Sequence, residues 1–282
     1  MTEVDMTGKT CVVTGANTGI GRDTAVVLAE AGATVILACR SLERTQPVLD
    51  EINREVAEGR AQFVKLDLGS LSSVRRAAED ILEMAPTIDV LVNNAGVAGI
   101  KGATEEGFEI HFGVNHLGHF LLTKLLLERI KESAPARIVN VASRAHQRAG
   151  GLDFDALQEP TRSKTGVPEY NASKLANILY SAELARRLEG TGVTTYSLHP
   201  GVVASDIWRE VPGIFQPIIK LFMISTEEGA RATLHCAMSE EAGEETGLYY
   251  DQKGRKKKPK APAEDKELAA ELWRRSEEWI EA

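Results

Sequence analysis

The sequence predicts an open α/β fold, in which a mostly parallel, seven-stranded sheet lies between two layers of helices. Short apolar segments rich in valine alternate with amphipathic segments along most of the 282 residues. Segments that are apolar over their whole length indicate parallel strands buried on both faces. Regular alternation of strand and helix is typical of a doubly wound sheet. The composition, 43% hydrophobic and 26% charged, is ordinary for a globular protein.

The strands and helices follow one another in a regular order. The predicted strands are TCVVTG (10–15), ATVILAC (33–39), AQFVKLD (61–67), IDVLVNNAG (88–96), ARIVNVAS (136–143), VTTYSLHPG (193–201) and YYD (249–251). Helices are predicted at 19–31, 41–58, 70–84, 104–132, 167–190 and 226–239, with a last one near 268–280. We find no linker and no repeat, so we expect one domain over residues 1–282.

Charge, cysteine usage and hydropathy exclude several classes of protein. The formal net charge of −8 argues against a nucleic-acid surface. Cys11, Cys39 and Cys236 show no Cys-x-x-Cys spacing, so we expect buried thiols in a reducing compartment. The N-terminus is polar, and no run of about 18 uncharged apolar residues occurs. We therefore expect a cytoplasmic protein without a metal site, and contact with a membrane surface stays open.

A glycine-rich turn, TGANTGIG, follows the first predicted strand. Its glycines let the backbone turn tightly and approach a ligand, and the free N–H groups of the next helix suit a pyrophosphate. The alternative is an ordinary turn, but its place in an alternating α/β pattern favours a Rossmann-like dinucleotide site. The expected contacts are Gly15, Asn17, Thr18, Gly19, Ile20 and Gly21.

Arg40 directly follows the second predicted strand, in VILACRS. A carboxylate here would bind the ribose hydroxyls of NAD and repel a 2′-phosphate, whereas a guanidinium offers donors to that phosphate. Ser41 adds a hydroxyl, and Arg22 is a candidate for a second positive charge. The alternative is a plain surface arginine. We expect NADP(H) to be preferred over NAD(H).

Four polar residues form a second candidate group. Tyr170 and Lys174, in YNASK, share one face of a predicted helix, where the ammonium is expected to lower the pKa of the phenol. Ser143 ends the fifth predicted strand, at the edge where open α/β sheets bind ligands. Asn115 lies in the predicted helix 104–132. Taken singly they are a surface pair, a cap and a solvated amide, but together they predict a site of proton transfer.

With these motifs in place, the sequence resembles the short-chain dehydrogenase/reductase superfamily over residues 8 to about 245. The matching motifs are TGANTGIG, LDL (66–68), NNAG (93–96), Asn115, Ser143, YNASK and HPG (199–201). The family's catalytic tetrad corresponds to Asn115, Ser143, Tyr170 and Lys174.

The resemblance implies that a carbonyl takes hydride from the nicotinamide and a proton from Tyr170, and that alcohol oxidation runs in reverse. Ser143 would position the carbonyl oxygen. Lys174 would hold the nicotinamide ribose and tune Tyr170, while Asn115 would support a water-linked proton path. Further implied cofactor contacts are Asp67 and Leu68 at the adenine, Asn94, Ala95 and Gly96 near the ribose, Val141, and Pro200, Gly201, Val203 and Ser205 at the carboxamide.

Longer matching segments indicate one branch of this superfamily. The segments LACRS, NHLGHFLLTKLLLERI, RIVNVAS and TGVTTYSLHPGVV are similar to retinol dehydrogenases, which include NADP(H)-dependent retinal reductases. That branch shares the long insert 144–169, which is expected to frame the substrate entrance. The apolar segment 206–225, interrupted by prolines, stands where the fold places a substrate lid. It could instead pack on the protein or a partner subunit, or insert into a membrane surface beside the basic run 255–260, which is otherwise a solvated loop.

The expected function is hydride transfer between NADP(H) and an apolar aldehyde or alcohol, with all-trans-retinal and retinol as the best guess. Alternatives keep the chemistry on a steroid, lipid or xenobiotic substrate or a small secondary alcohol. A non-catalytic nucleotide-sensing or scaffolding protein is the alternative from another class. A dimer or tetramer is implied through the helices 104–132 and 167–190. The domain is expected to divide into a core at about 8–245, a lid at about 206–225 and a C-terminal extension at about 253–282.

Overall fold

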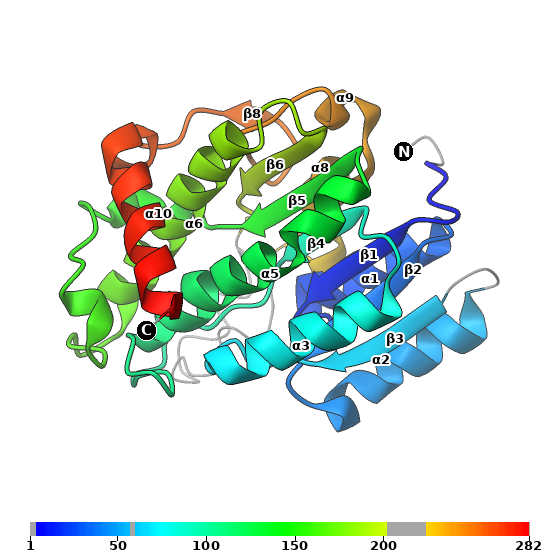
Figure 1. The fold of residues 1–282 in the computed structure, drawn as a ribbon, viewed down its shortest axis with the longest axis horizontal. Coiled ribbons are helices and arrows are strands. Elements are labelled where there is room, and N and C mark those ends of the chain that lie inside the picture. The colour runs from blue at the N-terminus through cyan, green and yellow to red at the C-terminus, as the bar shows by residue number, and fades with distance from the viewer. Residues whose placement is uncertain (1–3, 57–59, 202–223, 282) are drawn as a thin grey trace.

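The computed structural model describes residues 4–56, 60–201 and 224–281, and it confirms the α/β class (Figure 1). A sheet in the order β3-β2-β1-β4-β5-β6-β7-β8 lies between two layers of helices. Strands β1 to β7 run parallel, whereas β8 is antiparallel to β7. The predicted count of seven strands is therefore wrong by one. The additional strand pairs Lys256 and Lys257 with the backbone of Tyr250 and Tyr249.

The elements agree closely with the predicted ones over most of the chain. The strands are β1 (Thr10–Thr14), β2 (Thr34–Cys39), β3 (Arg60–Lys65), β4 (Val90–Asn93), β5 (Ala136–Val141), β6 (Val193–Leu198), β7 (Leu248–Tyr250) and β8 (Lys256–Lys257). The α-helices are α1 (Gly19–Glu30), α2 (Leu42–Glu55), α3 (Leu71–Met84), α4 (Ile110–Phe112), α5 (Gly118–Glu132), α6 (Val167–Arg187), α8 (Thr226–Met238), α9 (Glu240–Gly243) and α10 (Lys266–Glu281). Shorter helical turns lie at Gly113–Leu117, Arg144–Arg148, Ala156–Gln158 and Ala261–Glu264.

Each face of the sheet is covered by its own set of helices. Figure 1 looks onto the face covered by α3, α5 and α6, with α10 outside them, while α1 and α8 lie behind the sheet. The buried residues accordingly form two apolar clusters, one on each side. Strands β1 and β4 are buried along their whole length, which explains why their sequences are continuously apolar.

The order of the strands reverses direction at β1. Strand β2 lies on one side of β1 and β4 on the other, so the chain switches sides between them. At such a switch point the loops after adjacent strands separate and leave a crevice at the carboxyl ends of the strands. The glycine turn after β1 and the NNAG segment after β4 both lie at this edge.

The predicted helix 104–132 is wrong at its N-terminal end. The α-helical backbone begins at Ile110, because the Glu109 carboxylate accepts hydrogen bonds from the N–H groups of His111 and Phe112. A π-helical turn, Gly113–Leu117, then separates α4 from α5. Such turns occur frequently at functional sites, and this one carries Asn115.

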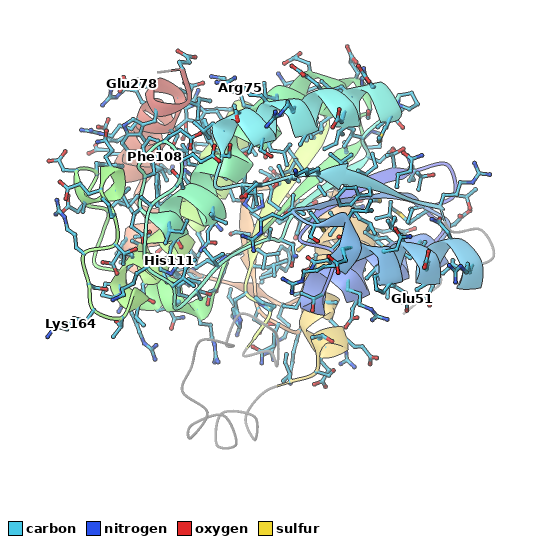
Figure 2. All side chains as sticks on the ribbon, turned by 90° about the horizontal axis from the view of Figure 1, so that it is seen from below. Glu51, Arg75, Phe108, His111, Lys164 and Glu278 are labelled. Carbon is cyan, nitrogen blue, oxygen red and sulfur yellow. The ribbon has the colours of Figure 1, made fainter. Side chains whose placement is uncertain are left out.

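The C-terminal helix α10 packs across α5 and α6 (Figure 1). Trp273 stacks on Tyr180 with 5.8 Å between ring centroids and meets Phe120 edge-on at 5.0 Å. Ser276 hydrogen bonds with His116 at 3.1 Å. Figure 2 shows Arg75 and Phe108 near the same helix, which carries Glu278. The C-terminal extension is thus part of the packed structure.

Three further expectations concern chain-wide properties. Cys11, Cys39 and Cys236 are buried and free, as predicted. None of the helices in the described ranges is long and apolar enough to span a bilayer. Within the same ranges, no group of three or more His, Cys, Asp or Glu side chains is placed to bind a metal ion.

Candidate active site

The glycine turn brings β1, α1 and β4 together more closely than other residues would permit. Gly15 has φ +68°, and a Cβ there would lie 2.9 Å from the Cα of Ala95. A Cβ on Gly21 would collide with the carbonyl oxygen of Gly15 and with the Asn94 amide. The missing side chains therefore create the close backbone approach that a dinucleotide fold requires.

Helix α1 begins at this turn with its first N–H groups uncapped by side chains. Thr18, the N-cap residue, has an extended backbone and makes no side-chain cap hydrogen bond. The first turn of the helix contains no acidic residue. Free N–H groups and the positive end of the helix dipole together suit a phosphate. The predicted contacts Asn17, Gly19 and Ile20 belong to the same turn.

Thr14 joins the ends of β1 and β4. Its Oγ1 accepts hydrogen bonds from the backbone N–H groups of Asn94 and Ala95, both at 2.9 Å. The Asn94 side chain in turn donates to the Thr14 carbonyl at 2.8 Å. We call this group of Thr14, Asn94 and Ala95 the nucleotide floor, because it lies next to the glycine turn that is predicted to bind the dinucleotide.

Gly96 connects the nucleotide floor with the second candidate group. A Cβ at this position would lie 3.1 Å from Oδ1 of Asn115 and 3.6 Å from Nζ of Lys174. The predicted cofactor residues of NNAG and two residues of the predicted tetrad therefore meet at one place. Asp67 and Leu68, which follow β3, lie further along the same edge. Asp67 accepts a hydrogen bond from the Gly69 N–H at 2.9 Å.

Arg40 directly follows β2 and is exposed at the carboxyl edge of the sheet. No carboxylate among residues 4–56, 60–201 and 224–281 forms an ion pair with it. Ser41 is the N-cap of α2 and accepts from the Arg44 N–H at 3.3 Å. Arg22, the candidate for a second positive charge, is already paired within the chain. Its guanidinium binds Asp23 and both carboxylate oxygens of Glu51, a residue marked in Figure 2.

Asn115 is held by its side chain between two other elements. Its Oδ1 accepts from the Val97 N–H at 2.8 Å, and its Nδ2 donates to the Val97 carbonyl at 3.1 Å. Nδ2 also donates to the hydroxyl of Ser173 on α6 at 3.0 Å. Asn115 is 1% exposed, so the alternative of a solvated amide on a helix surface is wrong. Asn115 instead ties the loop after β4 to α6.

Tyr170 and Ser143 form the partly exposed part of the site. Burial raises the pKa of the Tyr170 phenol, and its hydrogen bond with Ser143 lowers it by a smaller amount. The expected lowering of this pKa is thus wrong in direction, because desolvation is the largest influence on the phenol. The Nζ of Lys174 lies 5.9 Å from the ring centroid. Ser143 ends the strand region as the N-cap of the turn Arg144–Arg148 and accepts from the Ala145 N–H at 3.1 Å.

Lys174 is 3% exposed and lies one helical turn after Tyr170. Its Nζ donates to the carbonyl oxygen of Val141 at 3.0 Å, and Asn177 donates to the same oxygen at 3.3 Å. Burial lowers the pKa of Lys174 to about 8. The ammonium is therefore predominantly charged at neutral pH, in a position where its charge is poorly solvated.

Of the cofactor contacts predicted in the loop after β6, the structure describes Pro200 and Gly201. Pro200 is buried, and Gly201 has φ +92° with its N–H donating to Nδ1 of His199 at 3.2 Å. Burial lowers the pKa of His199 to about 4. Val203, Ser205 and all but the end of the predicted lid 206–225 lie outside the described residues.

Two buried histidines near the tetrad were not predicted. His111 contacts the Tyr170 ring edge-on at 6.1 Å between centroids, and its Nδ1 lies 2.9 Å from the Glu109 carboxylate. His119 lies between Asn115 and Thr14, with a nitrogen toward each. The spacing of four residues from Asn115 to His119 could have indicated a shared helix face. The partner of His119 on β1 is remote in the sequence and left no such signal.

The basic run 255–260 is mostly neutralised within the chain. Arg255 pairs with Asp251 at 2.7 Å, Lys256 with Glu245, and Lys258 with Glu264 at 3.3 Å. These pairs favour the prediction of a solvated surface, although Lys256 and Lys257 also form β8.

The sequence of this chain is similar to a known protein family and to several characterised proteins. The family model described as short chain dehydrogenase matches residues 9–154. Retinol dehydrogenase 13 of Homo sapiens is 46% identical over 280 residues, which cover 95% of this chain and 83% of that protein. Retinol dehydrogenase 11 of Homo sapiens is 48% identical over 240 residues, which cover 84% of this chain and 75% of that protein.

Solved structures show the same fold, two of them with a bound cofactor. An uncharacterized protein from Mycobacterium paratuberculosis is 34% identical, with a TM-score of 0.79, and the match covers 99% of this chain and 96% of that one. A 3-ketoacyl-(acyl-carrier-protein) reductase from Brucella melitensis, complexed with NADH, has a TM-score of 0.68 at 26% identity over 88% and 97% of the two chains. The RhlG/NADP complex from Pseudomonas aeruginosa has a TM-score of 0.70 at 27% identity over 88% and 95%.

Proposed function

The chain belongs to the short-chain dehydrogenase family of oxidoreductases, and from this premise we propose that it transfers hydride between NADP(H) and an apolar aldehyde or alcohol. All-trans-retinal and retinol are the best single substrate pair. The observation that carries the proposal is the meeting of Gly96 with Asn115 and Lys174 at the carboxyl edge of the sheet. There a cofactor cradle and proton-transfer groups share one place.

In the reducing direction, the Tyr170 phenol would donate its proton to the carbonyl oxygen of the substrate. Burial raises its pKa, so the phenol is protonated at neutral pH and has a proton to give. Ser143 would hold the same oxygen, since its hydroxyl lies at the phenol and is partly exposed. When bound, the nicotinamide cofactor would supply the hydride that the carbonyl carbon takes up, and together with the proton from Tyr170 this hydride would convert an aldehyde into an alcohol.

Lys174 would stabilise the negative charge that develops on the Tyr170 oxygen when the proton leaves. A charged ammonium acts more strongly in a site from which water is largely excluded. Its bond to the Val141 carbonyl fixes the side chain in place. Asn115 would hold the loop after β4, which carries Gly96, against α6. Oxidation of an alcohol would use the same groups in reverse.

The preference for NADP(H) rests on Arg40. Its exposed guanidinium stands at the end of β2, where a planar set of donors suits a 2′-phosphate. The solved relatives bind either NADH or NADP, so the family alone does not decide between them. Ser41 would contribute through the N-terminus of α2, which it caps.

The retinoid substrate is proposed from the names of the relatives, retinol dehydrogenases 11 and 13, at 46–48% identity. A steroid, lipid or xenobiotic carbonyl would use the same tetrad and is the alternative substrate class. A non-catalytic role is disfavoured because all four tetrad residues are present. Contact with a membrane surface and a homo-oligomer remain proposals, and an interface across α5 and α6 would have to include α10.

The proposed function is tested by following NADPH consumption with purified protein. All-trans-retinal is compared with steroid ketones and short aldehydes, each with NADPH and with NADH. The proposal predicts the largest kcat/KM for retinal with NADPH. A larger kcat/KM for another substrate class would replace the substrate, and no turnover with any of them would contradict the enzymatic reading.

A further inference from the structure

His119, in the first turn of α5, hydrogen bonds through both nitrogens of its ring. Nδ1 lies 3.1 Å from the carbonyl oxygen of Asn115, and Nε2 lies 2.8 Å from Oγ1 of Thr14. The side chain is 3% exposed. One buried ring thus contacts both the nucleotide floor and a residue of the predicted tetrad.

The donors and acceptors in this link follow from its chemistry. Burial lowers the pKa of His119 to about 4, and the nearby charge of Lys174 acts in the same direction, so the ring is neutral at pH 7. A carbonyl oxygen can only accept, so Nδ1 must carry the single ring proton. Nε2 must then accept, and the Thr14 hydroxyl donates to it. The same hydroxyl oxygen accepts from the N–H groups of Asn94 and Ala95.

The result is a directional chain of hydrogen bonds across three elements. It runs from the N–H groups at the end of β4, through Thr14 on β1 and His119 on α5, to the backbone of Asn115. Hydrogen bonds in such chains polarise one another, and in a buried site each unpaired member is costly. The alternative acceptor for the Thr14 hydroxyl, the Val92 carbonyl at 3.3 Å, is more distant than Nε2.

We propose that His119 is a positioning residue that couples the nucleotide floor to Asn115. The inference rests on the proposed function for its effect on turnover, but the link itself consists only of residues of this chain. Side-chain bonds already hold Asn115 to Val97 and Ser173. His119 fixes the backbone of Asn115 relative to β1, so that the nucleotide floor and the tetrad keep a constant position relative to each other.

Two substitutions separate the halves of the link, because each preserves the place of one ring nitrogen. His119→Asn keeps an amide donor near Nδ1, for the Asn115 carbonyl, and loses the acceptor for Thr14. His119→Gln keeps an acceptor near Nε2 and loses the donor to Asn115. We expect H119N to raise the Kd of NADPH about tenfold with a smaller change in kcat, and H119Q to lower kcat about tenfold with a smaller change in Kd. H119L should both raise the Kd of NADPH and lower kcat.

A matched control and a non-enzymatic readout complete the experiment. His235 on α8 faces Tyr250 on the opposite side of the sheet, so H235Q should change neither constant more than about twofold. Nitrogen-15 NMR of histidine-labelled parent protein should show His119 neutral at pH 7 with the proton on Nδ1. This readout needs neither turnover nor stable variants.

The outcomes separate this proposal from the proposed function. A proton on Nε2, or a cationic ring at pH 7, would overturn the link directly. If H119N and H119Q raised the Kd by the same factor and lowered kcat by the same factor, His119 would be only a packing residue. If the parent binds NADPH but reduces no carbonyl, the proposed function fails, while the NMR result and the order of the Kd values still decide the link.

Discussion

The buried charge of Lys174 should make the parent protein less stable than a variant without it. Burial lowers the pKa of this lysine from 10.5 to about 8. Each pKa unit corresponds to about 1.4 kcal/mol, so at pH 7 the charge costs about 3 kcal/mol of the free energy of unfolding. Lys174→Met keeps the length of the side chain and removes the charge. It also removes the hydrogen bond to Val141, worth about 1 kcal/mol, so the expected net gain is about 2 kcal/mol.

The dependence on pH gives this prediction its sign. Between about pH 8 and 10.5 the unfolded chain binds more protons at Lys174 than the folded chain does. The stability of the parent therefore rises with pH in this window relative to K174M. At pH 9.5 the cost of the charge falls to about 1.5 kcal/mol, which leaves a net gain of about 0.5 kcal/mol.

Urea unfolding of parent and variant at pH 7 and 9.5 measures this difference, with unchanged m-values as the sign of a two-state comparison. Lys124→Met is the matched control, because Lys124 is half-exposed and pairs with Glu277 at 3.0 Å. It should give no gain and no trend with pH. If K174M were less stable than the parent at pH 7, or its advantage grew toward pH 9.5, the reasoning would be refuted.

Three further predictions concern the reaction itself. Tyr170→Phe should lower kcat by at least about a hundredfold while NADPH still binds, because the proton donor is lost; turnover at the parent rate would exclude Tyr170 as the acid. Arg40→Asp should raise the KM of NADPH at least about tenfold more than that of NADH, whereas the control R22Q should keep the parent's preference; equal losses for both cofactors would remove Arg40 from recognition. The kcat/KM for reduction should decline as pH rises through about 8, where Lys174 loses its charge, and a profile that is flat from pH 7 to 9.5 would contradict a role for that charge.

The geometry of the glycine turn was predictable because its signals are local. Gly15 and Gly21 are required by close backbone contacts, and those contacts follow from a strand, a turn and a helix in immediate succession. Asn115, Ser143, Tyr170 and Lys174 were singled out by the order of their motifs, and the structure brings their side chains close together. The parallel sheet brings the ends of β4 and β5 to one edge, as the alternation of elements indicated.

The sequence did not show features that depend on particular side-chain contacts or on the extent of burial. Glu109 caps α4 with its own carboxylate, so the amphipathic pattern before Ile110 does not become helix. Arg22 is neutralised by Glu51, 29 positions away on α2. For Tyr170, the sequence shows a lysine four positions on but does not show how strongly the surrounding fold desolvates the phenol.

The central claim, hydride transfer to a carbonyl with a proton from Tyr170, is tested most directly by isotope transfer. Parent protein and Y170F are incubated with all-trans-retinal and NADPH that carries deuterium at the transferable position of nicotinamide carbon four, and the product is analysed by mass spectrometry. We predict retinol with one deuterium on its alcohol carbon from the parent and almost none from Y170F. Retinol without deuterium, or equal labelled product from Y170F, would contradict the account.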